Sequence, residues 1–110
     1  MSERTERARQ AYEAYETSDR KLIESLLADD LTFYAPPDPG IDRETYFERC
    51  WPAAGHSRSF EIVRLIEDGD EVIITYEGAR DDGAHFRNTE IMTFRGDQIV
   101  KIEVYFGWDL

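Results

Sequence analysis

Cysteine is almost absent from this chain of 110 residues, which contains only Cys50. A single cysteine excludes an intrachain disulfide, and it leaves no cysteine pair for a zinc signature. The two histidines, His56 and His85, do not stand at a metal-ligand spacing either. We therefore expect a cytoplasmic protein with no metal site, in which Cys50 is a small buried residue.

Long apolar runs and an excess of positive charge are also missing. No run approaches the ~20 residues of a membrane helix, and the polar N-terminus does not resemble a signal peptide. The chain has 24 acidic and 13 basic residues, a formal net charge of -11. Such a charge repels phosphate backbones, and no phosphate-binding glycine loop or nucleophile elbow is present. We expect neither a nucleic-acid partner nor a membrane partner.

The chain does have enough apolar residues for a core and a lined cavity. Hydrophobic residues make up 41% and aromatic residues 13% of the sequence. The length fits one domain spanning residues 1–110. Helical spacing of apolar residues predicts helices over residues 3–17 and 20–28. Ser18 or Asp19 can cap the second helix, and Asp42 can cap a third that ends near Trp51.

The second half of the chain has the alternating pattern of strands. We predict a short strand over residues 31–35, then a stiff proline loop over 35–40 that is neither helix nor ladder. Four strands follow at 58–66, 71–79, 84–94 and 98–108, joined by turns in which glycine stands beside aspartate. The predicted class is α+β, with three helices packed in a cone formed by a curved, mainly antiparallel sheet.

Alternation along the last strand separates an inner face from an outer face. We place Val100, Ile102, Val104, Phe106 and Trp108 inside, because they are uniformly apolar. The outer face then mixes apolar residues with both signs of charge, and the apolar ones are Ile73, Ile91, Ile99 and Tyr105. This mixture favours a homodimer through the outer sheet face, and a plain solvated face is the alternative.

Glu90 is the most informative single residue, because it stands in an apolar-leaning row between Asn88 and Met92. Burying an ionised carboxylate is costly, so its pKa should rise. A neutral buried acid can donate a hydrogen bond to a developing oxyanion. The alternative is a structural pair, for example with Arg64 or with a helix amide.

Other residues are candidates for the same site. Asn88 can donate to a carbonyl or orient Glu90, and the hydroxyl of Tyr12 or Tyr15 can reach the cavity from the first helix. Asp38 is an alternative base at the mouth, although an aspartate that stabilises a turn is the simpler interpretation. The predicted pocket walls, for which core packing is the alternative, are Phe33, Trp51, Tyr76, Met92, Ile102, Phe106 and Trp108.

Several short motifs, taken together and in order, resemble the NTF2-like superfamily in its SnoaL-like branch. They are the segments 11–15, 18–19, 26–33, 68–72 and 99–106, which read AYEAY, SD, LLADDLTF, DGDEV and IVKIEVYF. The resemblance covers nearly all of the chain. It implies a cystatin-like cone of curved sheet around helices, usually dimeric, with a pocket inside.

The resemblance also has implications for the site. The superfamily contains ketosteroid isomerases, polyketide cyclases, epoxide hydrolases, dehydratases and many non-catalytic modules. In the isomerases, the oxyanion-hole aspartic acid falls at Glu90, and the oxyanion tyrosine falls near Ala11, beside Tyr12. Their general base falls at Ala35, which cannot accept a proton.

Two functional hypotheses follow. The first is a pocket protein for a small apolar carbonyl or hydroxyl compound, in which Glu90 acts as acid or oxyanion donor without a cofactor. Its reaction would be an isomerase-, lyase- or cyclase-type proton transfer. The second is a non-catalytic binding or dimerisation module, which the alanine at position 35 favours.

Overall fold

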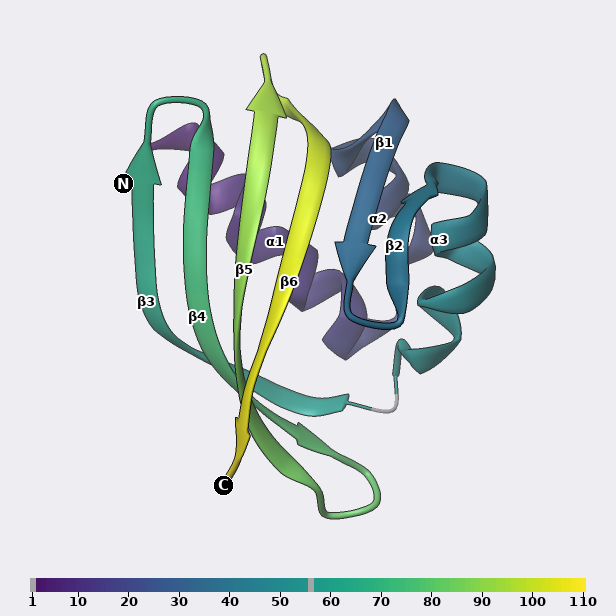
Figure 1. Cartoon of the computed structure of the whole chain (residues 1–110), viewed down its shortest axis with the longest axis vertical. Helices are drawn as coiled ribbons and strands as arrows, with labels where there is room; N and C mark the ends of the chain where they lie inside the picture. Colours follow the sequence, from purple (N-terminus) through teal and green to yellow (C-terminus); the bar gives the residue numbers. More distant parts are fainter. Residues whose placement is uncertain (1, 56) are drawn as a thin grey trace.

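The computed structural model of this chain describes residues 2–55 and 57–110, so His56 lies outside the described part (Figure 1). Its helices are α1 (Glu3–Thr17), α2 (Arg20–Leu26) and α3 (Arg43–Arg49), and a short 3-10 turn, η1 (Trp51–Ala53), follows α3. Its strands are β1 (Leu27–Ala35), β2 (Asp38–Asp42), β3 (Ser57–Asp68), β4 (Glu71–Arg80), β5 (His85–Arg95) and β6 (Gln98–Asp109).

The strands form one six-stranded sheet in the order β2-β1-β6-β5-β4-β3. All neighbouring strands are antiparallel except β1 and β6, which are parallel. Figure 1 shows the helices on one side of this twisted sheet, with the long strands β3 to β6 curving at their lower ends. The predicted α+β cone with a mainly antiparallel sheet is confirmed.

The helices begin where the sequence provides a side-chain acceptor for the first free amides. Ser2 accepts a hydrogen bond from the Thr5 amide at 3.1 Å, and Asp42 accepts one from the Thr45 amide at 2.9 Å. Asp19, rather than Ser18, caps α2. None of the helices in the described part is long and apolar enough to cross a membrane.

Three predicted element boundaries differ from the structure. The second helix ends at Leu26 rather than Ala28, because Leu27 already pairs with Ile99 in the parallel ladder between β1 and β6. Strand β1 therefore starts four residues before the predicted Leu31. The third helix ends at Arg49, and Trp51 belongs to the 3-10 turn that follows.

The proline-rich segment is not a simple loop, contrary to the prediction. Only Pro36 and Pro37 form the turn, and β2 begins at Asp38, opposite Ala35. Pro39 is tolerated inside β2 because this is an edge strand, where the missing amide costs no ladder bond to a further strand. Gly40 bulges out of the ladder with φ +90°, a conformation that glycine adopts without strain.

Two β-bulges in β6 change which of its residues face inwards. Thr93 pairs with Lys101 but Phe94 pairs with Ile99, so Val100 is the extra residue and Ile99 turns into the core, contrary to the prediction. A bulge adds one residue to one strand and reverses its alternation beyond that point.

The second bulge lies near the end of β6. Asn88 pairs with Phe106 but Arg87 pairs with Trp108, which leaves Gly107 extra and turns Trp108 to the outer face. Only glycine fits here, since a Cβ atom on Gly107 would clash with the carbonyl oxygen of Arg87. Trp108 is 62% exposed and packs under the Arg87 guanidinium at 5.6 Å.

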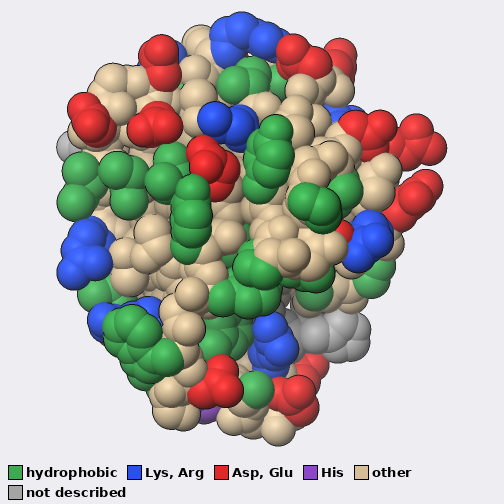
Figure 2. All heavy atoms as spheres, in the orientation of Figure 1, with side chains coloured by type: hydrophobic (Ala, Val, Ile, Leu, Met, Phe, Trp, Pro, Cys, Tyr) green, Lys and Arg blue, Asp and Glu red, His purple; other side chains and the backbone are tan. Residues whose placement is uncertain are grey.

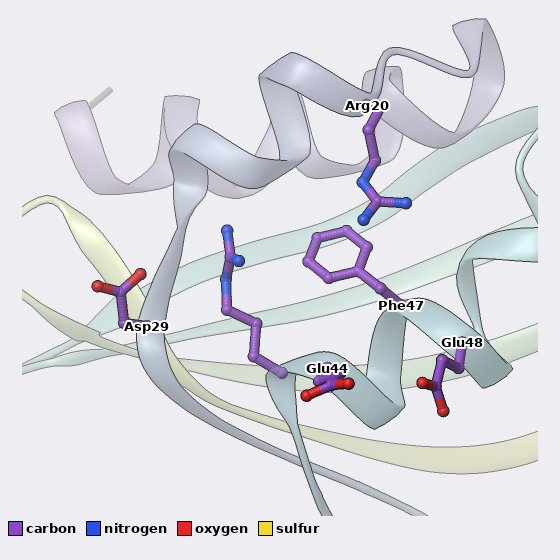
Figure 3. A pocket seen from close by; sticks show the side chains of 6 residues that line it. Arg20, Asp29, Glu44, Phe47 and Glu48 are labelled. Carbon is purple, nitrogen blue, oxygen red and sulfur yellow. The ribbon is translucent and has the colours of Figure 1, made fainter.

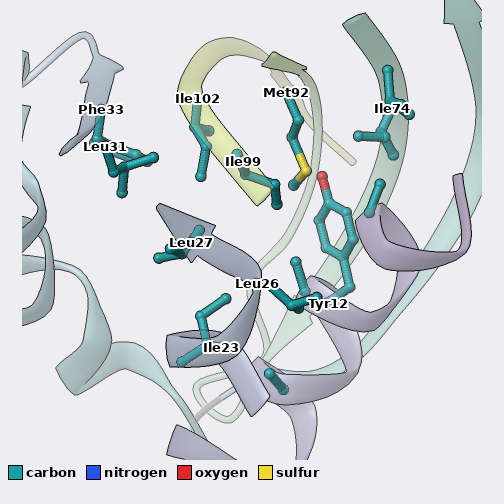
Figure 4. Packing of buried hydrophobic residues seen from close by; sticks show 14 of the residues in the cluster. Tyr12, Ile23, Leu26, Leu27, Leu31, Phe33, Ile74, Met92, Ile99 and Ile102 are labelled. Carbon is teal, nitrogen blue, oxygen red and sulfur yellow. The ribbon is translucent and has the colours of Figure 1, made fainter. Parts of the chain in front are cut away.

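The outer sheet face is turned to the viewer in Figure 2, where apolar side chains lie scattered among acidic and basic ones. The core lies on the opposite face, between the sheet and the helices. Figure 4 shows Leu26 and Tyr12 from the helices packed against Ile74, Met92 and Ile99 from the strands. The helices cover this inner face except around a cavity at the open end of the cone.

Candidate functional site

A cavity of about 290 Å³ lies between the inner face of the sheet and the helices. Its lining is contributed by the three helices, the 3-10 turn η1, the turn between β1 and β2, and residues of all six strands. Five of the seven predicted wall residues line it, namely Phe33, Tyr76, Met92, Ile102 and Phe106. A pocket of this size, mostly apolar with a few polar groups, is typical of a small-molecule site.

The two predicted tryptophan walls are wrong. Trp51 lies outside the lining and packs edge-on against the ring of Tyr15, with ring centroids 5.1 Å apart. It supports a residue that does line the cavity. Trp108 is on the outer face because of the bulge at Gly107.

Glu90 extends from β5 into this cavity. The Tyr76 hydroxyl, from the neighbouring strand β4, donates a hydrogen bond to Oε2 of Glu90 at 2.7 Å. Burial raises the pKa of Glu90 from 4.5 to about 7, and the hydroxyls of Tyr76 and Tyr12 oppose part of that rise. Arg64, the suggested structural partner, instead donates to Thr75 on the other face of the sheet.

Asn88 holds the donor to Glu90 in place. Its Nδ2 donates to the Tyr76 hydroxyl at 3.3 Å, and its Oδ1 accepts from the Gly107 amide at 3.3 Å. These bonds form a chain from the backbone of β6 through Asn88 and Tyr76 to the Glu90 carboxyl. The bulge at Gly107 therefore also provides the amide that fixes the Asn88 side chain.

The hydroxyl of Tyr12 is buried and lies close enough to Glu90 to favour its charged form, but no group in the described part of the chain meets it in hydrogen-bonding geometry. Figure 4 shows this hydroxyl next to the side chain of Met92. Burial and the negative charge of Glu90 raise the pKa of Tyr12 well above its usual value, so the hydroxyl keeps its proton. Leaving a buried donor without a partner is costly, and a ligand oxygen would remove that cost.

Tyr15 also lines the cavity, but its hydroxyl is already hydrogen-bonded to the hydroxyl of Tyr46. Burial raises the pKa of both groups. Of the predicted site residues, the structure thus brings Glu90 and Asn88 into one hydrogen-bond network, with Tyr12 beside it. Tyr15 belongs to a separate pair.

Sequence reasoning missed the polar roles of Tyr76 and Tyr46. Tyr76 was predicted only as a wall, yet it is the direct donor to Glu90. A signal was available, because Tyr76 shares the inner row of β4 with Ile74, which pairs with Glu90, and it pairs with Asn88 itself. No comparable pattern indicated Tyr46.

Asp38 is not a turn residue, contrary to the simpler interpretation of the sequence. It is the first residue of β2, it is buried, and it lines the cavity beside Ala35. Its Oδ1 forms an ion pair with Arg49 of α3 at 2.7 Å, in a geometry that is not that of a hydrogen bond. The site therefore contains a second carboxyl group besides Glu90.

The Cys50 thiol also lines the cavity, and it is only partly buried. Burial and the negative charge of Asp38 raise its pKa to about 11, so the thiol stays protonated and unreactive. Within residues 2–55 and 57–110, no group of three or more His, Cys, Asp or Glu side chains is placed to hold a metal ion, and we assign no metal site.

A second, shallower pocket lies on the surface between α2 and α3 (Figure 3). The guanidinium groups of Arg20 and Arg43 lie 4.0 Å and 5.1 Å from the centre of the Phe47 ring. Asp29, Glu44 and Glu48 complete its lining. None of these residues is a buried titratable group, so the cavity at Glu90 is the candidate functional site.

Several solved structures share this fold at low sequence identity. A protein of unknown function with a cystatin-like fold from Xanthomonas campestris has a TM-score of 0.81 at 14% identity, over 98% of this chain and 92% of its own. An LEH-like epoxide hydrolase from M. tuberculosis gives 0.81 at 19% identity, over 96% and 83%. A ketosteroid isomerase candidate from Kribbella flavida gives 0.80 at 13% identity, over 96% and 78%.

Identities this low show a common fold and do not assign an activity. A search among curated proteins gives no match. The family model of the SnoaL-like domain, in contrast, matches residues 8–102, which is most of the chain. The motifs that resembled the NTF2-like superfamily lie almost entirely within the matched region. The chain belongs to the SnoaL-like domain family.

Proposed function

We propose that this protein is a cofactor-independent enzyme that transfers a proton on a small, mainly apolar carbonyl or hydroxyl compound. The reaction would be of the isomerase, lyase or cyclase type. One observation carries the proposal: the Glu90 carboxyl is half-buried, lines the cavity, and has a pKa raised by desolvation to about 7. A catalytic acid or base is most effective when its pKa lies near the working pH.

In this proposal Glu90 acts in its neutral form. A protonated Glu90 donates a hydrogen bond to the ligand oxygen, where negative charge develops as the proton leaves carbon. The unpartnered hydroxyl of Tyr12 is a second donor for the same oxygen. Asn88 and Tyr76 position the carboxyl, and Asp38, an ion-paired carboxylate in the lining, receives the carbon-bound proton.

The cavity limits the size of the substrate. Its volume of about 290 Å³ is at the small end of the range for ligand pockets, which is roughly 300–1,000 Å³. Two solved structures of this fold, an LEH-like epoxide hydrolase and a ketosteroid isomerase candidate, support small-molecule chemistry in this fold. We therefore propose a compound smaller than a steroid.

A non-catalytic binding module is the second candidate function. Ala35 favours it, because it stands where the resembling isomerases have their base. The cavity beside Glu90 counts against it, because a purely structural module is expected to fill this space with its own side chains. We also propose that the protein is a cytoplasmic homodimer that associates through the outer sheet face.

Hydrogen exchange on simple ketones tests the proposed chemistry. We would incubate the protein with a panel of small cyclic and aromatic ketones in D₂O and follow loss of the α-hydrogen signal by NMR. We expect wild type to accelerate exchange for at least one ketone, and Glu90→Gln to reduce that rate about 100-fold, within the range for a general acid. Glu103→Gln, the same change on the outer face, is the matched control.

If no ketone exchanges faster with protein than without it, or if Glu90→Gln exchanges as fast as wild type, the proposed chemistry is wrong. A ketone that binds in the cavity without any exchange would favour the binding module instead.

A further inference from the structure

The charged residues around the cavity do not follow the charge of the whole chain. Acidic residues outnumber basic ones by 24 to 13. Among the side chains that the structure describes, however, the charged ones in the lining are two acids, Asp38 and Glu90, and two arginines, Arg49 and Arg80. When Glu90 is neutral, two guanidinium groups face one carboxylate. A cavity with a positive balance in such an acidic protein indicates selection for a negative ligand.

Arg80 is held at the cavity by a specific arrangement of two neighbouring strands. Gly78 and Arg80 share the inner row of β4, and Gly78 pairs with Phe86 of β5. A Cβ atom on Gly78 would lie 2.5 Å from the Phe86 ring, so only glycine lets the ring lie across this strand. The guanidinium of Arg80 lies over that ring, 4.8 Å from its centre.

Among the described residues of the lining, Arg80 is also the cation whose charge is not matched by an acid. Arg49 is paired with Asp38 at 2.7 Å. Within the part of the chain that the structure describes, Arg80 has no ion pair, and its recorded partner is the Phe86 ring. The nearby Asp82 accepts a hydrogen bond from the Ala84 amide inside the turn. The guanidinium of Arg80 therefore has hydrogen-bond donors available for a ligand.

The distance between the two ends of the cavity suits a small molecule. Glu90 pairs with Ile74, and Arg80 stands six residues beyond Ile74 along β4. At ~3.3 Å per residue, this separation is about 20 Å along the strand, and the long side chains of Glu90 and Arg80 shorten the gap between their functional groups. A molecule with one aromatic ring and a short acidic arm spans such a gap.

We infer that the ligand of this cavity is a short oxo- or hydroxycarboxylic acid whose carboxylate binds Arg80 at the mouth. Its carbonyl or hydroxyl oxygen then lies at Glu90, the part that rests on the proposed function. A guanidinium binds a carboxylate through two parallel hydrogen bonds, and this geometry is specific to arginine. The apolar middle of the ligand contacts the aromatic walls between the two ends.

A matched pair of probes tests this inference. We would measure the binding of 4-hydroxyphenylacetate and of its neutral amide, 4-hydroxyphenylacetamide, by calorimetry at pH 6, where Glu90 is mostly protonated. We expect wild type to bind the acid about tenfold more tightly, the effect of one charge-assisted contact. Arg80→Gln should weaken the acid about tenfold and leave the amide unchanged, and added salt should weaken only the acid.

Arg95→Gln is the control, because it removes an equal charge at the opposite end of β5, where Arg95 pairs with Asp30. It should leave the binding of both probes unchanged. Binding of the amide by Arg80→Gln also shows that the variant is folded.

Equal affinity of wild type for acid and amide, or equal weakening of both by Arg80→Gln, would overturn the inference. The proposed function would survive that outcome if Glu90→Gln still weakened the amide. Failure of wild type to bind either probe at millimolar concentration would count against the proposed pocket and this inference together.

Discussion

At the scale of single residues, the site depends on the opposition between burial and hydrogen bonding at Glu90. Burial disfavours the charged form, whereas the hydroxyls of Tyr76 and Tyr12 favour it, and burial is the larger effect. With burial alone, the acid would stay neutral well above pH 7. With stronger donors, it would stay charged and could not donate a proton.

The first prediction concerns the dependence of stability on pH. The folded-state pKa of Glu90 is raised to about 7 from 4.5, so the folded protein keeps this proton at pH values where the unfolded chain has lost it. The contribution of Glu90 to stability is therefore most favourable below pH 4.5, falls as the pH rises to 7, and stays low above it. Glu90→Gln should change stability little at pH 4.5 and raise it by about 2 kcal/mol at pH 8.

Denaturant unfolding at the two pH values measures this difference. The expected gain is less than the full value of the pKa shift, because the cavity is open to water at its mouth. Glu103→Gln, the same change on the outer face, is the matched control. The explanation fails if Glu90→Gln has the same effect on unfolding at pH 4.5 and pH 8.

At the scale of helices and strands, the contact between β2 and α3 decides whether Asp38 is part of the site. The Asp38 side chain is 9% exposed and its partner Arg49 is 55% exposed. A buried carboxylate that loses its partner is left with an uncompensated charge. The ion pair therefore fixes the edge hairpin of β1 and β2 against α3.

A double-mutant cycle measures this coupling. We expect Arg49→Gln alone to lower the free energy of unfolding by about 1–2 kcal/mol, and Asp38→Asn with Arg49→Gln to cost about 1 kcal/mol less than the sum of the single changes. The same cycle on Asp30 and Arg95, both 64% exposed, should give only a few tenths of a kcal/mol. Equal coupling in the two pairs would show that burial of Asp38 adds nothing.

The periodicity of apolar residues within one segment predicted the helices and strands whose form does not depend on a neighbouring strand. It missed the features that depend on which strands pair with each other. The long helix α1 and the strands β3 to β6 followed from periodicity and from glycine beside aspartate in the turns. Strand β2 was missed because a proline is compatible with a strand only at a sheet edge, and the edge position is a property of the whole sheet. The bulges at Val100 and Gly107 are likewise set by the partner strand.

The same distinction applies to the site. Glu90 was found because an acid among apolar residues is visible in the sequence, and its hydrogen bond to Tyr76 now gives that position a physical basis. The burial of Asp38 was not visible, because it depends on pairing with Ala35 across the proline turn. Trp108 was misplaced because one extra glycine reversed the alternation before it.

At the scale of the whole molecule, the outer sheet face is suited to a second copy of the chain. Val63, Ile66, Tyr105 and Trp108 are between 43% and 62% exposed. They lie among charges of both signs, such as the Arg87–Glu77 pair at 2.8 Å (Figure 2). A face that carries both signs can complement itself about a twofold axis.

We therefore expect a mass twice that of the 12.8 kDa chain by light scattering after size exclusion. Tyr105→Glu should shift the protein towards monomer, because it places an added negative charge in the apolar part of each copy. Leu110→Glu changes an equally exposed apolar residue beyond the end of β6 and should leave the mass unchanged. A wild-type protein with the mass of one chain would contradict the dimer.

The raised pKa of Glu90 also couples the binding of a ligand to the uptake of a proton from the solvent. At pH 7 about half of the molecules lack the Glu90 proton, so a ligand that needs this proton draws about half a proton from the buffer for each molecule bound. The heat of binding then contains the ionisation heat of the buffer and differs between one buffer and another. The fraction of the protein that has ligand bound would fall as the pH rises. Binding would therefore depend on the pH as well as on the concentration of the ligand.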